Sequence, residues 1–261
     1  MSNTLPKSPS FRLDGLPVLV TGASSGLGQG CAVALAEMGA VVTLAARQPE
    51  ALEQTAELMA EQGYQVKIQV MDVSDVVACQ DAVAAQADTD LGPFRVVVNS
   101  AGLARHTPSV DTTPQDYDAV MDLNVRGAYF LMQAAGRALI SAGQPGSLIN
   151  ISSQMGHVGG IDRAVYCASK HAVEGFTKAM AIEWGKHQVR INSICPTFIR
   201  TPLTASTFEQ PDKVDWIKSK IHLGRVGEVE DIMGAVQYLA SPASALVTGT
   251  SLLVDGGWTA E

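Results

Sequence analysis

Short apolar stretches alternate along the chain with longer segments in which apolar residues recur every three or four positions. The apolar stretches are mostly continuous, which is typical of strands whose two faces are both covered. They lie at residues 17–20, 41–45, 66–70, 95–98, 147–151, 189–194 and 251–254. The segments between them predict helices at residues 26–38, 50–62, 76–87, 114–141, 164–186 and 228–239.

This repeated alternation of strand and helix predicts an α/β fold. Each strand–helix–strand unit closes as a right-handed crossover, which makes the strands parallel. We therefore expect a Rossmann-type, doubly wound parallel sheet of about seven strands with helices on both faces. Residues 11–261 would form this single domain, and the polar residues 1–10 would form a flexible N-terminal arm.

Residues 201–227 interrupt the alternation. The segment is locally polar, carries charges of both signs and includes Phe208 and Trp216. A long insertion between a strand and a helix often covers a site, so we expect a substrate lid here. An ordinary surface excursion is the alternative.

Composition and charge narrow the range of partners. The net charge of −8 does not provide the basic surface that nucleic acid requires. A membrane-spanning helix needs about 20 apolar residues, and the chain has no such run. The N-terminus lacks the apolar centre of a signal peptide, so we expect a cytoplasmic protein. The four scattered cysteines predict buried free thiols, and the five histidines show no metal-ligand spacing, so no metal is predicted.

A glycine-rich turn follows the first predicted strand. Residues 18–28 read VLVTGASSGLG, so that a strand runs into a turn and the turn into a helix. Backbone N–H groups at a helix N-terminus bind pyrophosphate, and glycine lets the backbone approach it closely. The turn therefore predicts a dinucleotide site. The absence of a Gly-Lys-Ser/Thr sequence disfavours a P-loop.

Tyr166 and Lys170 lie four residues apart in a predicted helix, so their side chains project from one face. A free tyrosine has a pKa of about 10 and is a poor acid or base near neutrality. A nearby ammonium group stabilises the phenolate and lowers that pKa. Tyr166 could then exchange a proton with an alcohol or an alkoxide. On its own, such a pair usually has a structural role. The glycine turn upstream favours a catalytic role here.

With these motifs the sequence resembles the single-domain short-chain dehydrogenases/reductases from about residue 16 to residue 257. The resemblance rests on the Gly-x3-Gly-x-Gly spacing of the turn, on Tyr166 and Lys170, and on Ser153, thirteen residues before the tyrosine. It implies that Ser153 orients the substrate oxygen, Tyr166 transfers the proton, and Lys170 tunes the tyrosine and binds the nicotinamide ribose. The amide of Asn124 would hold a water that links Lys170 to solvent, with a helix-packing role as the alternative.

The resemblance also implies a cofactor site. The acidic residue that NAD-preferring members carry after the second strand is Ala46 here, and Arg47 follows it. A guanidinium pairs well with a 2′-phosphate, so NADP(H) is favoured. NAD(H) remains open, because Ser25 stands where many NADP-preferring relatives have a second basic residue. The expected cofactor-binding set is Gly22, Ser24, Ser25, Gly26, Leu27, Gly28, Arg47, Asp72, Val73, Asn99, Ala101, Gly102, Tyr166, Lys170, Pro196, Ile199 and Thr201.

Three positions have a second interpretation or depart from the family's pattern. Asp72 is expected to accept a hydrogen bond from the adenine amino group, but it could instead cap the next helix. Ser100 replaces the second asparagine of the family's Asn-Asn-Ala-Gly motif. Thr197 replaces the glycine of its Pro-Gly step and is a candidate substrate contact.

These observations predict an NADP(H)- or NAD(H)-dependent oxidoreductase that interconverts a secondary alcohol and a ketone. Motifs near both chain ends resemble the gluconate 5-dehydrogenase-like branch that acts on sugars, polyols and sugar acids. Arg105, Arg163 and Arg200 could bind a substrate carboxylate or could be solvated charges. A general ketone or diketone reductase, an isomerase or dehydratase on the same scaffold, and a non-catalytic dinucleotide-binding regulatory protein are the alternatives. The resemblance also implies a homotetramer with a small-molecule substrate.

Overall fold

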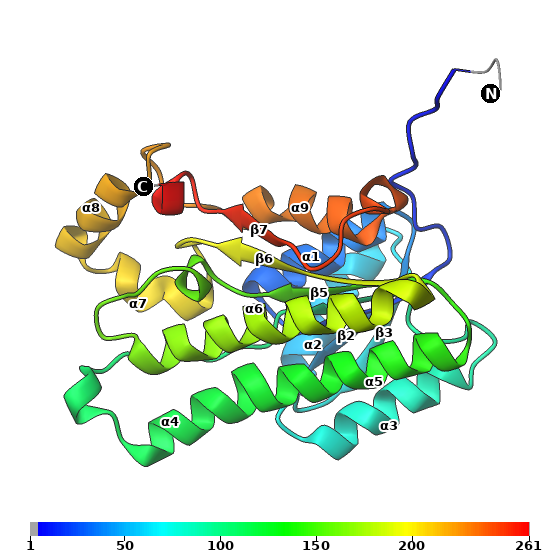
Figure 1. Cartoon of the computed structure of the whole chain (residues 1–261), viewed down its shortest axis with the longest axis horizontal. Coiled ribbons are helices and arrows are strands. Elements are labelled where there is room, and N and C mark those ends of the chain that lie inside the picture. Colours follow the sequence, from blue (N-terminus) through cyan, green and yellow to red (C-terminus); the bar gives the residue numbers. More distant parts are fainter. Residues whose placement is uncertain (1–4, 261) are drawn as a thin grey trace.

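Parallel strands form one twisted sheet in the computed structural model, which describes residues 5–260 (Figure 1). The strands are Pro17–Thr21 (β1), Val41–Ala46 (β2), Val66–Val70 (β3), Val96–Asn99 (β4), Gly146–Ile151 (β5), Val189–Pro196 (β6) and Ser251–Val254 (β7). Their spatial order is β3-β2-β1-β4-β5-β6-β7, and each neighbouring pair is parallel. The order reverses between β1 and β4, where doubly wound sheets bind their ligands. The predicted fold class is confirmed.

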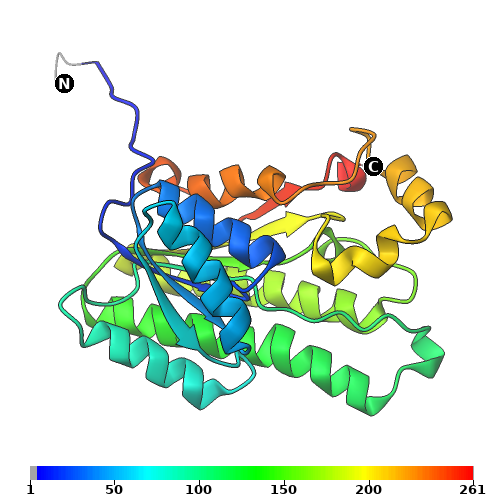
Figure 2. The same ribbon diagram turned by 180° about the vertical axis from the view of Figure 1, so that it is seen from behind.

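Helices cover both faces of the sheet (Figures 1 and 2). One face carries α1 (Gly26–Glu37), α2 (Pro49–Glu61) and α9 (Glu230–Ala240), and the other carries α3 (Val76–Ala87), α5 (Ala128–Ser141) and α6 (Ala164–Trp184). The sequence of β1 is continuously apolar because both faces of this strand are buried. Val18 and Val20 pack into the core on the first face, whereas Leu19 packs into the core on the second.

The predicted helix at residues 114–141 is interrupted. It consists of α4 (Pro114–Met121), a π-helical segment (Asp122–Gly127) and α5. A π turn holds one more residue than an α turn, and such turns often lie at functional sites. The segment contains Asn124. An apolar pattern with a period of 3.6 residues does not reveal a local change of this kind.

The remaining segments lie around the sheet. α7 (Ala205–Phe208) and α8 (Pro211–Lys220) lie beyond the carboxyl ends of the strands (Figure 1). Part of the expected N-terminal arm, residues 1–4, lies outside the described residues, and residues 5–10 are exposed and without regular secondary structure. None of the described helices is both long enough and apolar enough to span a bilayer. The four cysteines are buried and unpaired, as predicted.

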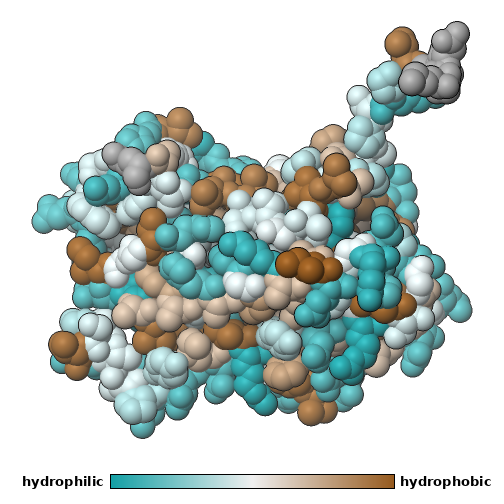
Figure 3. All heavy atoms as spheres, viewed as in Figure 1, coloured by the Kyte–Doolittle hydropathy of each residue, from teal (hydrophilic) through white to brown (hydrophobic). Residues whose placement is uncertain are grey.

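The face formed by α5 and α6 carries a band of apolar side chains (Figure 3). Tyr129 on α5 is 37 % exposed and Ile182 on α6 is 84 % exposed. Leu253, on the edge strand β7, is 41 % exposed. Large exposed apolar side chains that gather on one face are typical of interfaces between subunits.

Candidate functional site

The glycine turn connects β1 to α1 at the point where the strand order reverses. Gly22 (φ +65°) and Gly26 (φ +55°) adopt the left-handed conformation that favours glycine. A Cβ on Gly22 would lie 3.0 Å from the backbone nitrogen of Ala101, and a Cβ on Gly28 would collide with the carbonyl of Gly22. These glycines let α1 begin close against the ends of β1 and β4. The turn thus places the N-terminus of a helix at the edge of the sheet.

A cavity of about 400 Å³ lies beside this turn. Most of the residues expected to bind the cofactor line it, namely Gly22, Ser24, Ser25, Gly26, Leu27, Gly28, Arg47, Asp72, Val73, Ala101, Gly102, Tyr166, Lys170 and Thr201. Its wall also contains residues outside the expected cofactor-binding set, namely Ala46, Gln48, Met71, Ser100, Leu103, Leu123, Ile151, Ser152, Pro202 and Leu203, of which only Ala46 and Ser100 had been singled out in the sequence. Most of the missed residues adjoin a predicted motif. The glycine cradle, and a lining that extends from Arg47 after β2 to Tyr166 and Lys170 on α6, fit a dinucleotide.

Three residues of the expected cofactor set do not line the cavity. Asn99 is buried and accepts a hydrogen bond from the Thr21 hydroxyl at 2.7 Å. Pro196 is the last residue of β6. Ile199 is buried, and its carbonyl accepts a hydrogen bond from the Thr204 hydroxyl at 2.6 Å. The contacts expected between these residues and the cofactor stay predictions.

Arg47 and Asp72 lie together at one end of the cavity. The Arg47 side chain is 71 % exposed, and its Nη1 lies 3.8 Å from Oδ2 of Asp72. Oδ1 of Asp72 accepts hydrogen bonds from the backbone N–H and the hydroxyl of Ser74, at 2.9 and 2.7 Å. The N-cap of α3 is Asp75, whose carboxylate accepts from two N–H groups of the first turn. The alternative that Asp72 caps this helix is therefore wrong.

Tyr166 and Lys170 lie on the same face of α6, with Nζ of the lysine 5.6 Å from the centre of the tyrosine ring. Nζ donates a hydrogen bond to the carbonyl of Ile151 at 3.0 Å, and burial lowers the pKa of Lys170 to about 8. Burial raises the pKa of Tyr166, whereas a hydrogen bond with Ser153 and the charge of Arg163 act to lower it. The pKa of Tyr166 is raised overall, because burial outweighs these two effects, and the expected influence of Lys170 on the tyrosine stays a prediction.

Ser153 directs its hydroxyl group towards a second cavity. Its Oγ accepts a hydrogen bond from the backbone N–H of Met155 at 3.1 Å, which leaves the hydroxyl proton free to be donated. Ser153, Thr197 and Tyr166 line this second cavity, and Tyr166 also lines the first. The tyrosine thus separates a cleft that fits a dinucleotide from a cavity that fits a small substrate.

Asn124 lies in the π-helical segment and is buried. Its Nδ2 donates to the carbonyl of Leu103 at 2.8 Å and to the Ser169 hydroxyl at 3.1 Å, and its Oδ1 accepts from the Leu103 N–H at 2.8 Å. Both N–H donors of the amide are thereby used. These contacts favour a positioning role, in which the amide fixes the loop after β4 against α6. The expected water relay stays a prediction.

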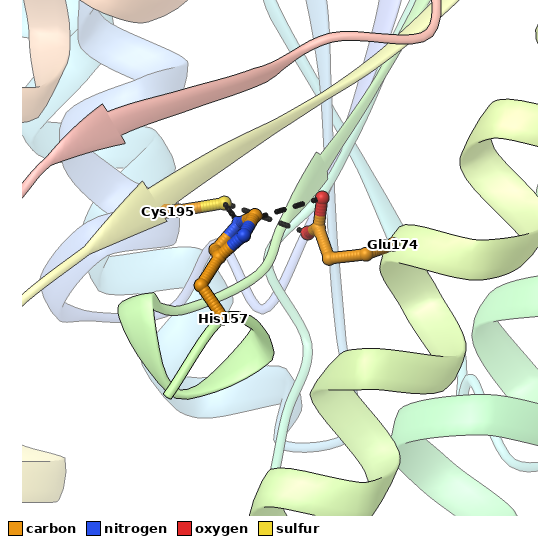
Figure 4. Close-up of side chains that lie close together, drawn as sticks. All are labelled: His157, Glu174 and Cys195. Atoms are coloured by element: carbon orange, nitrogen blue, oxygen red, sulfur yellow. Dashed lines mark hydrogen bonds and ion pairs between the residues drawn. The ribbon is translucent and has the colours of Figure 1, made fainter. Parts of the chain in front are cut away.

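A cluster forms one turn beyond Lys170 on α6, where buried Glu174 meets exposed His157 and buried Cys195 (Figure 4). Sγ of Cys195 lies 3.5 Å from Nε2 of His157 and 3.4 Å from Oε1 of Glu174. Burial raises the pKa of Cys195 to about 12, so the thiol is protonated. The three groups are close enough to ligate a metal ion, which their spacing in the sequence did not indicate.

The carboxylate of Glu174 also accepts hydrogen bonds from two serine hydroxyls. The Ser193 hydroxyl donates at 2.7 Å, and the Ser251 hydroxyl donates to the same oxygen, Oε2. Burial alone would raise the pKa of Glu174, but these hydrogen bonds lower it overall. The cluster therefore holds a buried negative charge near Lys170 and acts to raise the pKa of that lysine.

The segment at residues 201–227 contacts both cavities. Thr201 and Pro202 line the larger cavity, Thr204 and Thr207 line the smaller one, and Leu203 lines both. This is the position that a lid requires, and its movement stays a prediction.

The three candidate arginines differ in their surroundings. Arg105 forms an ion pair with Asp116 at 3.6 Å, and Arg200 forms one with Glu228 at 3.2 Å. Arg163 lines the smaller cavity. The sequence does not reveal this difference, because the ion-pair partners of Arg105 and Arg200 lie on other elements of the fold.

Comparisons with known proteins show the family of this chain. A family model described as enoyl-(acyl carrier protein) reductase matches residues 22–259. The chain is 37 % identical over 249 residues to the gluconate 5-dehydrogenase of Gluconobacter oxydans, covering 95 % of this chain and 96 % of that protein. It is 39 % identical over 254 residues to the D-threitol dehydrogenase of Mycolicibacterium smegmatis, covering 95 % of both.

A solved structure extends the similarity to three dimensions. The gluconate 5-dehydrogenase of Burkholderia cenocepacia, crystallised with NADP and tartrate, matches with a TM-score of 0.92 and 33 % identity over 96 % of this chain and 98 % of that one. These relatives are oxidoreductases, which disfavours the non-catalytic and isomerase alternatives. The chain therefore belongs to the short-chain dehydrogenase/reductase family, and it is a nicotinamide-dependent oxidoreductase that interconverts a secondary alcohol and a ketone.

Proposed function

We propose that this enzyme acts on a polyhydroxylated substrate, a sugar, polyol or sugar acid, with NADP(H) preferred over NAD(H). The observation that carries the proposal is the position of Tyr166 on the shared wall of the two cavities. The relatives named as gluconate 5-dehydrogenase and D-threitol dehydrogenase support this substrate class.

Three side chains take part in proton transfer, namely Ser153, Tyr166 and Lys170. The nicotinamide, when bound, supplies or accepts the hydride. Ser153 donates its hydroxyl proton to a hydrogen bond with the substrate oxygen and holds that oxygen beside Tyr166. During reduction Tyr166 gives its proton to the oxygen, and during oxidation it removes the proton of the alcohol. Lys170, anchored to the carbonyl of Ile151, stabilises the phenolate that remains after proton donation.

Asn124 positions the other groups. Its hydrogen bonds to Leu103 fix the loop that follows β4, and its bond to Ser169 fixes the helix that carries Tyr166 and Lys170. Loss of this amide would therefore displace the cofactor loop relative to α6. The lid at residues 201–227 would exclude water from both cavities when it closes.

The preference for NADP(H) depends on Arg47. Its ion pair with Asp72 is long and exposed, so the pair contributes little and the guanidinium can turn towards a 2′-phosphate. We expect Arg47→Ala to lower the ratio of kcat/KM for NADPH to that for NADH by about 10-fold or more. Lys67→Ala, which removes an exposed cation from β3, is the control and should leave the ratio unchanged. A strong NADH preference in the parent enzyme that Arg47→Ala does not alter would overturn the assignment.

A homotetramer is the proposed assembly, in a cytoplasmic enzyme. The exposed apolar band on α5 and α6 provides one face for contacts between copies (Figure 3), and the edge strand β7 with its exposed Leu253 provides another. Light scattering measures the mass directly, and a monomeric mass would refute the proposal.

The deciding experiment is a substrate panel of polyols, aldonates, cyclic alcohols and diketones, followed by absorbance of NADPH and NADH. Turnover of at least one polyhydroxylated substrate is expected. Tyr166→Phe should reduce turnover at least 1000-fold, roughly the scale of general acid–base catalysis, while binding of NADPH measured by fluorescence stays close to that of the parent. Efficient turnover by this variant would contradict the role given to Tyr166.

A further inference from the structure

The substrate cavity contains buried polar atoms that have no hydrogen-bond partner within residues 5–260. Gln154 follows the catalytic serine and is 1 % exposed, and neither its Oε1 nor its Nε2 is hydrogen-bonded. Oγ1 of Thr197, on the same cavity wall, is also buried and unpartnered. Buried polar groups are almost always hydrogen-bonded, so these atoms indicate a ligand with polar groups of its own. The hydroxyls of a polyhydroxylated substrate can both donate to and accept from an amide.

Arg163 contributes a positive charge to the same cavity. Among the described residues, no carboxylate lies within ion-pair distance of its guanidinium, in contrast to Arg105 and Arg200. The side chain is nonetheless held in place. Its guanidinium carbon lies 5.2 Å from the centre of the Phe198 ring, and its Nη1 donates to the carbonyl of Ile161 at 3.3 Å. A fixed guanidinium that lacks an acidic partner is suited to bind an anion.

Other charges around this cavity do not neutralise Arg163. The negative charge of Asp162 acts to raise the pKa of Arg163, but its carboxylate lies beyond ion-pair distance and lines a different hollow together with Arg105. His106, which lines the substrate cavity, has its pKa lowered by burial and by the positive charges of Arg163 and Lys213. The imidazole is therefore neutral near pH 7. Arg163 is left as the cation that faces the substrate.

We infer that Arg163 binds a carboxylate of the substrate, and that the enzyme prefers sugar acids to neutral polyols. The inference rests on the proposed function and specifies its substrate class. Arg163 is the N-cap residue of α6, three residues before Tyr166, and both side chains line the substrate cavity. The carboxylate would thus lie a few carbon atoms from the carbon that is oxidised, as in an aldonate. Gln154 and Thr197 would bind hydroxyls between the two.

A matched pair of substrates tests this inference. An aldonate and the alditol of the same chain length and configuration differ at one carbon, which is a carboxylate in the first and a CH2OH group in the second. The value of kcat/KM is measured for each substrate with the parent enzyme, Arg163→Met and Arg163→Lys. Arg163 also influences the pKa of Tyr166 in the free enzyme, but the free enzyme is the same for both substrates, so this effect cancels in the ratio of the two kcat/KM values. Arg105→Met, which removes an arginine from the neighbouring hollow, is the control.

The parent enzyme should favour the aldonate, and Arg163→Met should lower the aldonate-to-alditol ratio by roughly 10- to 100-fold, as expected for loss of a hydrogen bond between charged groups. Most of the change should fall on KM, since the carboxylate does not react. Arg163→Lys should retain part of the preference, and Arg105→Met should retain all of it. A ratio that Arg163→Met leaves unaltered, or a parent enzyme that favours the alditol, overturns the inference while the proposed function stands. Failure of every polyhydroxylated substrate in the panel overturns the proposed function instead.

Discussion

The buried carboxylate of Glu174 provides a quantitative test of how the catalytic helix is held. Glu174→Gln keeps the size of the side chain and removes the charge that accepts hydrogen bonds from Ser193 and Ser251. A hydrogen bond to a charged group is worth about 1.5–3 kcal/mol, and two such bonds are weakened here. We therefore expect the free energy of unfolding to fall by about 2–4 kcal/mol. For a domain of this size that corresponds to a decrease in Tm of roughly 5–15 °C.

The dependence on pH follows from the lowered pKa of Glu174. Its value in the folded protein lies below the ordinary 4.5, so the ionised carboxylate stabilises the fold fully at pH values above 4.5. This stabilisation is lost as the pH falls through the folded-state pKa. The difference in stability between the parent and Glu174→Gln should thus be constant near neutrality and should shrink below pH 4.5.

Urea unfolding at a series of pH values, followed by tryptophan fluorescence, measures this difference. Glu183→Gln is the matched control, because Glu183 lies on the same helix and is exposed. The control should lie within about 0.5 kcal/mol of the parent. If Glu174→Gln is as stable as Glu183→Gln at pH 7, or if its deficit persists undiminished in acid, the hydrogen-bonded cluster does not have the role given to it.

Two other substitutions have outcomes fixed by local geometry. Gly28→Ala would drive a Cβ into the carbonyl of Gly22, so NADPH affinity measured by fluorescence titration should fall at least about 10-fold. Gly234→Ala places its Cβ in open space on α9, so it should raise the free energy of unfolding by about 0.5–1 kcal/mol. Equal NADPH affinity in these two alanine variants would contradict the account of the turn. Gln154→Met should raise Tm and lower kcat/KM for polyhydroxylated substrates about 10-fold, because it removes two buried amide atoms that the substrate would satisfy. Unaltered kcat/KM would exclude Gln154 from the substrate contact.

The parts of the site that could be predicted from the sequence are those encoded by local spacing. The strand, turn and helix around Gly22 follow one another directly, and Tyr166 and Lys170 share a face because they are four residues apart in one helix. The order of elements then brings Ser153 to the same edge of the sheet, since the carboxyl ends of parallel strands meet there.

What could not be predicted depends on contacts between distant elements. The sequence does not distinguish Arg163 from the two arginines that form ion pairs. The acidic partner of Arg105 lies on α4, and the acidic partner of Arg200 lies in the segment before α9. The cluster of His157, Glu174 and Cys195 has the same origin, since its members come from a loop, a helix and a strand. The pKa of Tyr166 also depends on tertiary structure. Its burial cannot be read from the spacing of the sequence, and burial outweighs the hydrogen bond with Ser153 and the positive charge of Arg163.

Two cations flank Tyr166, Arg163 at the N-cap of α6 and Lys170 within the helix, and they make the proton affinity of the tyrosine depend on the substrate. Lys170 lines the cofactor cavity, whereas Arg163 lines the substrate cavity and lowers the pKa of the tyrosine. A carboxylate bound to Arg163 would offset that charge and let the tyrosine hold its proton more tightly. Since oxidation requires the deprotonated tyrosine, kcat for an aldonate should rise at a higher pH than kcat for the matching alditol.

Profiles of kcat against pH for the two substrates test this coupling. The rising limbs should be separated in the parent enzyme and should converge in Arg163→Met, where no guanidinium holds the carboxylate near the tyrosine. Coincident limbs in the parent would show that the anion does not reach Arg163 or that the guanidinium does not act on the tyrosine. If the aldonate-to-alditol ratio of kcat/KM still depends on Arg163, the anion does reach Arg163, and the guanidinium does not act on the tyrosine. The two outcomes can be separated because binding of the carboxylate and tuning of Tyr166 are different consequences of one charge.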